Sequence, residues 1–146
     1  MAYWDTSCLI KLYAPEPDSA DFELHILNGA SVVTSEIARL ELWAALRPKE
    51  AATELLPGGA SKALATFDAD VAAAQIFTKA IDPAVISKFE GVIETFFSRL
   101  PPLPLRTLDA IHISTAAVAG ELEIVATDKR LRDAATILGF RVYPPP

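Results

Sequence analysis

The feature that most constrains the fold is a regular alternation of short apolar segments with longer segments of helical character. The short segments predict strands at residues 2–4, 31–34, 76–81, 123–127 and 140–143. Between them, periodicity and capping signals predict helices at residues 6–13, 19–27, 35–47, 49–56, 60–75, 83–99, 108–119 and 129–138. Strands that alternate with helices predict a short, mostly parallel central sheet covered on both faces, which is a three-layer α/β/α sandwich.

Prolines and polar caps mark where these elements begin and end. Pro48 is expected to interrupt the helix that begins at residue 35, because a proline removes a helical hydrogen bond. Asp82 and Pro83 form an N-cap followed by proline at the first helical position. Thr107 is predicted to cap the next helix, residues 108–119, which is apolar nearly all round and should therefore lie at the centre.

Composition excludes several classes of protein. A chain of 146 residues with 51% hydrophobic and 22% charged residues predicts one globular domain spanning residues 1–146. The single cysteine, Cys8, excludes an intrachain disulfide, and no apolar run approaches the ~20 residues of a membrane helix. The first residues lack the basic region of a signal peptide, so a cytoplasmic protein is expected. The net charge of −6 argues against binding nucleic acid by bulk charge alone.

Two aspartates follow predicted strands directly. Asp5 comes after residues 2–4, Asp128 comes after residues 123–127, and each begins a helix. In a parallel sheet the carboxyl ends of the strands share one edge, where functional groups gather, so the two carboxylates should lie on the same side of the fold. The alternative is that each aspartate is an ordinary helix N-cap.

Two more acids interrupt helix faces that should be buried. Glu41 shares a helical stripe with Ile37 and Ala45, where an unpaired carboxylate would cost several kcal/mol. Arg39 or Arg47 could offset that cost as a purely structural partner.

Asp109 lies in the first turn of the helix at 108–119, on a face with His112 or Ile113. A first-turn aspartate also favours the helix dipole, and an isolated histidine such as His112 is more often a hydrogen-bonded core residue than a ligand or base.

Together, Asp5, Glu41, Asp109 and Asp128 suggest one pocket. Carboxylates repel by about 4 kcal/mol per pair at 4 Å and an effective dielectric near 20, so the pocket needs a counter-charge. An all-carboxylate set without cysteines or paired histidines suits Mg²⁺ or Mn²⁺ rather than zinc. The chemistry this implies is metal-assisted attack of water on a phosphodiester.

The segments around these acids resemble the motifs of PIN-domain nucleases, and in order, spacing and size the VapC-type toxins of toxin–antitoxin pairs. Asp5 begins the segment DTS, Glu41 lies within SEIARLELWAAL, Asp109 within LRTLDAIH and Asp128 within ATDKRL. The resemblance covers nearly the whole chain, from Tyr3 to Tyr143. It weakens at residues 51–81, an Ala-rich segment with a Pro-Gly-Gly turn, which leaves the lining of the substrate groove open.

The resemblance implies a Mg²⁺- or Mn²⁺-dependent endoribonuclease, a homodimer, and a small VapB-type antitoxin whose tail enters the active-site groove. By carry-over, Asp5 and Asp109 are expected as direct metal ligands. Glu41 would orient metal or water, and Asp128 would complete the site or hold a second metal. Thr6 and Thr127 are expected to support the site through hydroxyl or backbone hydrogen bonds.

Several side chains could help RNA approach an acidic chain. Basic candidates near the acids are Arg39, Arg47, Lys49, Lys129, Arg130 and Arg132, although each is individually more typical of a solvated helix face. The aromatic side chains of Tyr3, Trp4 and Trp43 could stack on bases, but burial in the core or in a dimer interface is favoured.

Two other functions remain open. A receiver-like or non-catalytic interaction domain also has acids at strand ends, but it normally has an acidic pair after the first strand and a lysine at a late strand end, whereas Lys129 follows an aspartate. A haloacid-dehalogenase-type phosphatase requires Asp-x-Asp after the first strand, where this chain has Ser7 in the third position.

Overall fold

The sheet is built as the alternation predicts, and it is parallel throughout. A computed structural model of the chain describes residues 1–29 and 31–145. Within these residues the strands are β1 (Ala2–Trp4), β2 (Val32–Ser35), β3 (Ile76–Lys79), β4 (Glu123–Val125) and β5 (Arg141–Tyr143). They pair in the order β3-β2-β1-β4-β5, and every pairing is parallel.

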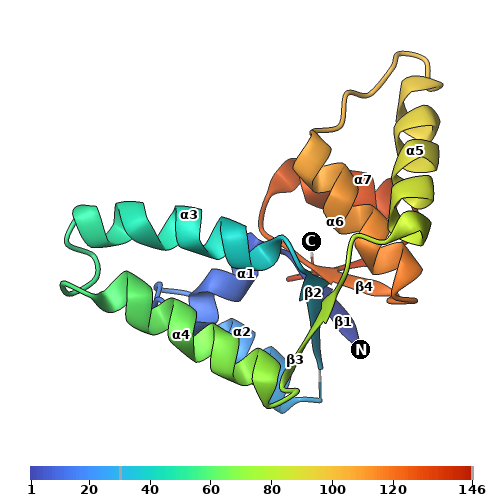
Figure 1. Ribbon diagram of the computed structural model, residues 1–146. Coiled ribbons are helices and arrows are strands. Elements are labelled where there is room, and N and C mark those ends of the chain that lie inside the picture. Colours follow the sequence, from blue (N-terminus) through green and yellow to red (C-terminus); the bar gives the residue numbers. More distant parts are fainter. Residues whose placement is uncertain (30, 146) are drawn as a thin grey trace.

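Helices cover both faces of this sheet, which confirms the predicted three-layer α/β/α sandwich (Figure 1). One layer holds α1 (Thr6–Leu9), a 3₁₀ turn η1 (Ile10–Leu12), α2 (Ser19–Leu27), α3 (Ala38–Ala51) and α4 (Gly59–Ala72). The other holds α5 (Pro83–Phe97), α6 (Thr107–Val118) and α7 (Lys129–Ile137). None of the helices in the described ranges has the length and apolar character needed to cross a membrane.

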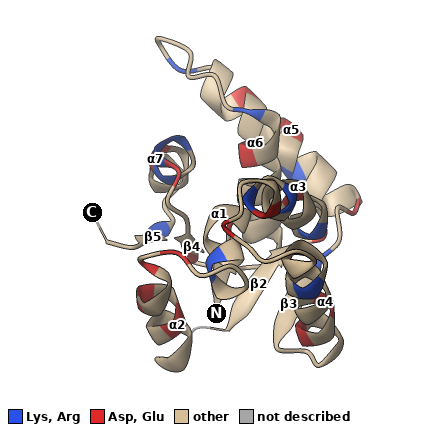
Figure 2. Ribbon diagram, turned by 90° about the vertical axis from the view of Figure 1, so that its left-hand side faces the viewer, with Lys and Arg blue, Asp and Glu red and all other residues tan. Residues whose placement is uncertain are grey.

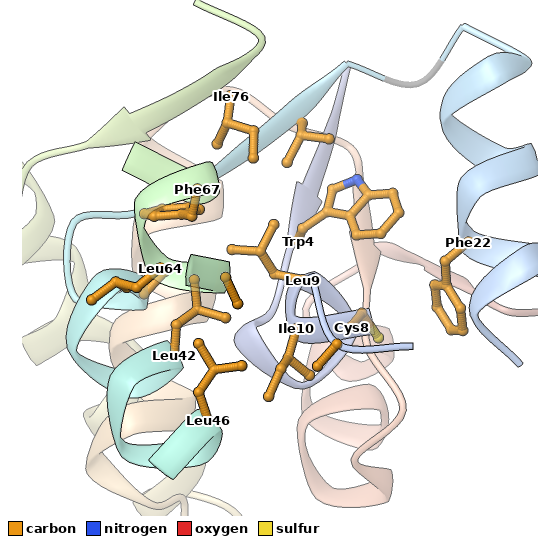
Figure 3. Close-up of a cluster of buried hydrophobic side chains, with 14 of the residues drawn as sticks. Trp4, Cys8, Leu9, Ile10, Phe22, Leu42, Leu46, Leu64, Phe67 and Ile76 are labelled. Carbon is orange, nitrogen blue, oxygen red and sulfur yellow. The ribbon is translucent and has the colours of Figure 1, made fainter. Parts of the chain in front are cut away.

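The two-residue period of β1 sends its side chains into two separate cores. Trp4 packs on one face with Leu9, Phe22, Leu42 and Phe67 (Figure 3).

Tyr3 points to the opposite face, where it packs with Val92, Phe96, Ile113 and Leu131. The sheet is therefore buried on both sides, as parallel sheets generally are. The helix at the centre of the second layer is α6, in agreement with its apolar sequence.

Several predicted boundaries are wrong, and the separate helix expected at residues 49–56 is absent, because α3 continues to Ala51 and the next helix, α4, begins at Gly59. Pro48 does not interrupt a helix but lies inside α3, whose buried Leu42 and Leu46 hold it against the core strongly enough to tolerate the lost hydrogen bond. Ser35 does not begin that helix, because it is the last residue of β2 and is paired with Lys79. Thr107 is the first residue of α6 rather than its cap.

The strand order contains a switch point that positions the site. From β1 the chain moves outward through β2 to β3, and it then returns to place β4 on the other side of β1. Residues that follow β1 and β4 therefore meet at the edge where the strand order reverses, which is where open α/β sheets bind ligands. Asp5 and Asp128 occupy these two positions.

Candidate active site

The structure brings the four acids of the sequence analysis together. Asp5, Glu41, Asp109 and Asp128 all line one cavity of about 440 Å³ at the carboxyl edge of the sheet. They come from the ends of β1 and β4, from α3 on one face, and from α6 on the other. The cavity therefore exists only because both helical layers meet at the switch point.

The strand-end aspartates are helix caps and cavity residues at once. Asp5 Oδ2 accepts the backbone N–H of Ser7 at 3.2 Å, and Asp128 Oδ1 accepts those of Arg130 and Leu131 at 2.8 and 3.2 Å. Each carboxylate has two oxygens, so capping leaves the other one for the cavity. Burial opposes ionisation of Asp128, but the hydrogen bonds from Leu131 and Arg106 hold its pKa below the usual value.

Glu41 is paired, though not by the arginines considered from the sequence. Arg39 binds Asp68 and Arg47 binds Glu50. The partners of Glu41 Oε1 are instead His112 Nε2 at 2.7 Å and the Thr6 hydroxyl, which donates at 2.9 Å.

Burial raises the pKa of Glu41, but the hydrogen bond and charge of His112 outweigh it and leave the pKa below the ordinary value. Thr6 thus supports the site through its hydroxyl, as the resemblance implies.

His112 is a buried histidine with hydrogen bonds on both ring nitrogens, which agrees with its prediction as a core residue. Only 1% of its surface is exposed, and its Nδ1 lies 2.7 Å from the Tyr3 hydroxyl oxygen. Its Nε2 also lies 3.5 Å from Asp5 Oδ1. Burial lowers the pKa of His112, but Glu41, followed by Asp5, raises it above the ordinary value. His112 also lines the cavity, where its Nε2 faces the carboxylates of both Glu41 and Asp5.

Arg106 is the cationic partner of the other two acids, a role that the sequence did not predict. Its Nε donates to Asp109 Oδ2 at 2.7 Å, and its Nη2 donates to Asp128 Oδ2 at 2.9 Å. These hydrogen bonds, the first of them to Asp109, raise the pKa of Arg106 further above its ordinary value. The available signal was the spacing: Arg106 precedes α6 and lies three residues before Asp109, within side-chain reach.

Two hydroxyls form a chain of contacts beside Asp5, of which that of Ser7 lines the cavity. The Ser7 hydroxyl donates to Asp5 Oδ2, and the Thr127 hydroxyl lies 3.4 Å from the Ser7 oxygen. These contacts connect the residues that follow β1 to those that follow β4. Ser7 received no role from the sequence, because a serine beside a helix cap carries no signal of a site.

The donor set fits a hard divalent cation, since every acid offers carboxylate oxygens. Within residues 1–29 and 31–145, however, no three His, Cys, Asp or Glu side chains are already arranged around a point that could hold a metal. The cause lies in the contacts above: Arg106, His112, Ser7 and Thr6 each hold one or more of the carboxylates. The chemistry of the site fits Mg²⁺ or Mn²⁺, while its geometry is set by internal partners.

Most of the predicted basic candidates are occupied elsewhere. Besides Arg39 and Arg47, Lys49 binds Glu16 and Glu54, Lys129 binds Asp133, and Arg132 donates to the backbone carbonyls of Ala126 and Pro144. Figure 2 shows basic positions on α7, and Arg130 of that helix lines a second cavity.

This second cavity, about 470 Å³, adjoins the acidic one. The two share Arg106 and Asp109, and the second has apolar walls that include Phe96, Leu103 and Ile137.

The aromatic candidates behave differently from one another. Tyr3 and Trp4 are fully buried, so neither can stack on a base, as the sequence analysis favoured. Trp43 is 39% exposed, and the Arg47 guanidinium lies 5.5 Å from its ring.

The comparisons with known proteins agree on one family. The family model for the PIN domain matches residues 2–137. Ribonuclease VapC46 of Mycobacterium tuberculosis is 34% identical over 145 residues, which cover 98% of this chain and 96% of that protein.

Two solved structures share the fold across nearly their whole length. Mycobacterium tuberculosis VapC20, a sarcin–ricin loop cleaving toxin, superposes with a TM-score of 0.67 at 17% identity and covers 96% of each chain. VapBC2 from Rickettsia felis, bound to a DNA fragment from its promoter, has a TM-score of 0.67 at 13% identity over 97% of each chain.

Proposed function

The chain belongs to the PIN domain family, and we propose that it is a VapC-type endoribonuclease, the cytoplasmic toxin of a toxin–antitoxin pair. The observation that carries this proposal is the convergence of four carboxylates, from both helical layers, on one cavity at the switch point of the sheet. The ribonuclease names of relatives that align over the whole chain support it.

The reaction is hydrolysis of an RNA phosphodiester: water attacks phosphorus, one P–O bond breaks, one fragment keeps the phosphate and the other ends in a hydroxyl. A bound Mg²⁺ or Mn²⁺ would acidify water and offset the charge of the phosphate. Asp5 and Asp109 are its proposed principal ligands. Asp128 completes the set.

Glu41 orients the attacking water in this scheme. Its hydrogen bonds from His112 and Thr6 both go to Oε1, so Oε2 stays available to a water molecule in the cavity. His112 and Thr6 act as positioning residues, because their hydrogen bonds hold the Glu41 carboxylate. Tyr3 in turn holds the His112 ring.

RNA reaches the acids beside the N-terminus of α6. Arg130 lies on the wall of the adjoining cavity, and no hydrogen bond or ion pair from its side chain occurs within the described residues. A free guanidinium next to four acids offers a phosphate contact.

We propose two protein partners as well. A VapB-type antitoxin is supported by the likeness to VapBC2. A homodimer is supported by exposed apolar side chains such as Trp43 and Phe97, although Phe96 is buried and adds nothing to that surface. Light scattering that shows a strict monomer at high concentration would contradict the homodimer.

Cleavage of RNA by the purified chain tests the main proposal. Asp5→Asn and Asp109→Asn keep the shape of each side chain and remove its charge, and we expect each to lower the cleavage rate by at least about 100-fold with Mg²⁺ or Mn²⁺. Asp68→Asn is the matched control, because Asp68 pairs with Arg39 outside the cavity. Equal rates in all four proteins would refute the proposal.

The receiver-like alternative makes the opposite prediction. It requires labelling of an acid by a small phosphodonor together with an absence of nuclease activity. The structure gives it little support, since the Lys129 side chain is 86% exposed, pairs with Asp133 and does not line the cavity.

A further inference from the structure

We propose that Arg106 is a tethered counter-cation that takes the place of the metal ion: it holds the acidic site together without metal, and it must leave before a divalent cation can bind. The inference rests on the proposed function in one respect, namely that the acids are metal ligands. It adds an intramolecular competitor that sets the metal affinity.

The contacts of Arg106 are made with the atoms that a cation would need. Its guanidinium bridges Asp109 on α6 and Asp128 at the start of α7, with N···O distances of 2.7 and 2.9 Å to the two Oδ2 atoms. A third contact, from Nη2 to Asp109 Oδ1, is 3.3 Å long. A guanidinium and a divalent cation at the same oxygens repel each other, and the oxygens cannot serve both in full.

The same contacts offset the repulsion among the acids. Carboxylates in one cavity repel, and the structure places one basic side chain on each side of it, Arg106 and His112. His112 hydrogen-bonds Glu41 and approaches Asp5, whereas the Arg106 guanidinium neutralises Asp109 and Asp128. His112 is enclosed in the core, so Arg106 is the partner that is able to leave.

The position of Arg106 allows its side chain to move away from the two carboxylates at a small cost in free energy. It occupies the N-cap position of α6 with extended backbone and no capping hydrogen bond from its side chain. That side chain is 51% exposed, against 10% for Asp109, so the arginine is the member of the pair that solvent can reach. It also borders the adjoining 470 Å³ cavity, which gives the released guanidinium a place to go without unfolding any element.

Calorimetric titration of the full chain with MnCl₂ tests the inference. Exposed ion pairs change an equilibrium constant by about 1.4- to 5-fold each, so losing two should tighten Mn²⁺ binding by about tenfold. We expect that increase in Arg106→Gln and a smaller one in Arg106→Lys, which keeps the charge but loses the forked geometry. Arg130→Gln, which removes a neighbouring charge that pairs with none of the four acids, should stay within about twofold of the wild type.

A second readout separates competition from a loss of structure. Without metal, Arg106→Gln should melt at a lower temperature than the wild type. Saturating Mn²⁺ should raise the melting temperature of Arg106→Gln by more than it raises that of the wild type. Equal or weaker Mn²⁺ binding by Arg106→Gln, with binding by the wild type intact, would overturn the inference and leave the nuclease proposal standing. Failure of both proteins to bind Mn²⁺ would overturn both.

Discussion

The substitution Tyr3→Phe tests how much the hydrogen bond between Tyr3 and His112 contributes to the free energy of unfolding. Tyr3→Phe deletes the hydroxyl that lies 2.7 Å from His112 Nδ1 and leaves the ring, which is fully buried, in place. Since His112 is enclosed as well, its Nδ1 is left without a partner and without water. An unsatisfied buried polar group costs about 1–3 kcal/mol, and we expect the free energy of unfolding to fall by that amount.

The expected change is large enough for ordinary calorimetry. For a chain of 146 residues, 1 kcal/mol corresponds to about 3 °C, so the melting temperature should fall by about 3–9 °C. Tyr13→Phe is the matched control: it deletes the same atom from a hydrogen bond with Asp70, whose carboxylate water can reach. If Tyr3→Phe were no more destabilising than Tyr13→Phe, the claim that His112 depends on a buried partner would be refuted.

Two further predictions concern the helical layer that contains α3 and η1. Pro48→Ala should restore the hydrogen bond missing inside α3 and raise the free energy of unfolding by about 1–3 kcal/mol, measured by urea titration; a loss of stability would show that the proline fits this helix. Lys11 binds Glu16 and Asp18 at 2.5 and 2.7 Å, and its hydrogen bonds outweigh any effect of burial on the carboxyl groups, lowering both pKa values. The stability they contribute is therefore present above the unfolded-state pKa values, near 4, and is lost as the pH falls through the lower folded-state values. In urea titrations, the free energies of unfolding of Lys11→Met and the wild type should differ more at pH 7 than at pH 2.5. A difference in free energy that does not depend on pH would contradict this assignment.

Local signals predicted most of the framework. The alternation of strands and helices, and the caps Asp82 and Asp128, depend on residues close together in the chain, and each agrees with the structure. The same local logic failed at Pro48, because packing of the α3 face, with Leu42 and Leu46, outweighs the local cost of a proline.

Local sequence signals did not predict which side chains pair with the acids. Sequence proximity suggested Arg39 and Arg47 for Glu41, but these arginines bind Asp68 and Glu50. The actual partner of Glu41, His112, lies 71 residues away along the chain and is brought to it by the packing of α6 across the sheet.

What the sequence by itself determined is where carboxylates had to occur: after two strands and on two helix faces, because backbone geometry and amphipathic period are local properties. What only the tertiary structure decided is how their charge is balanced. That depends on which basic side chains the fold brings to one edge of the sheet, namely Arg106 and His112. Electrostatic pairing depends on distance in space, and folding alone creates the short distances between residues far apart in the chain.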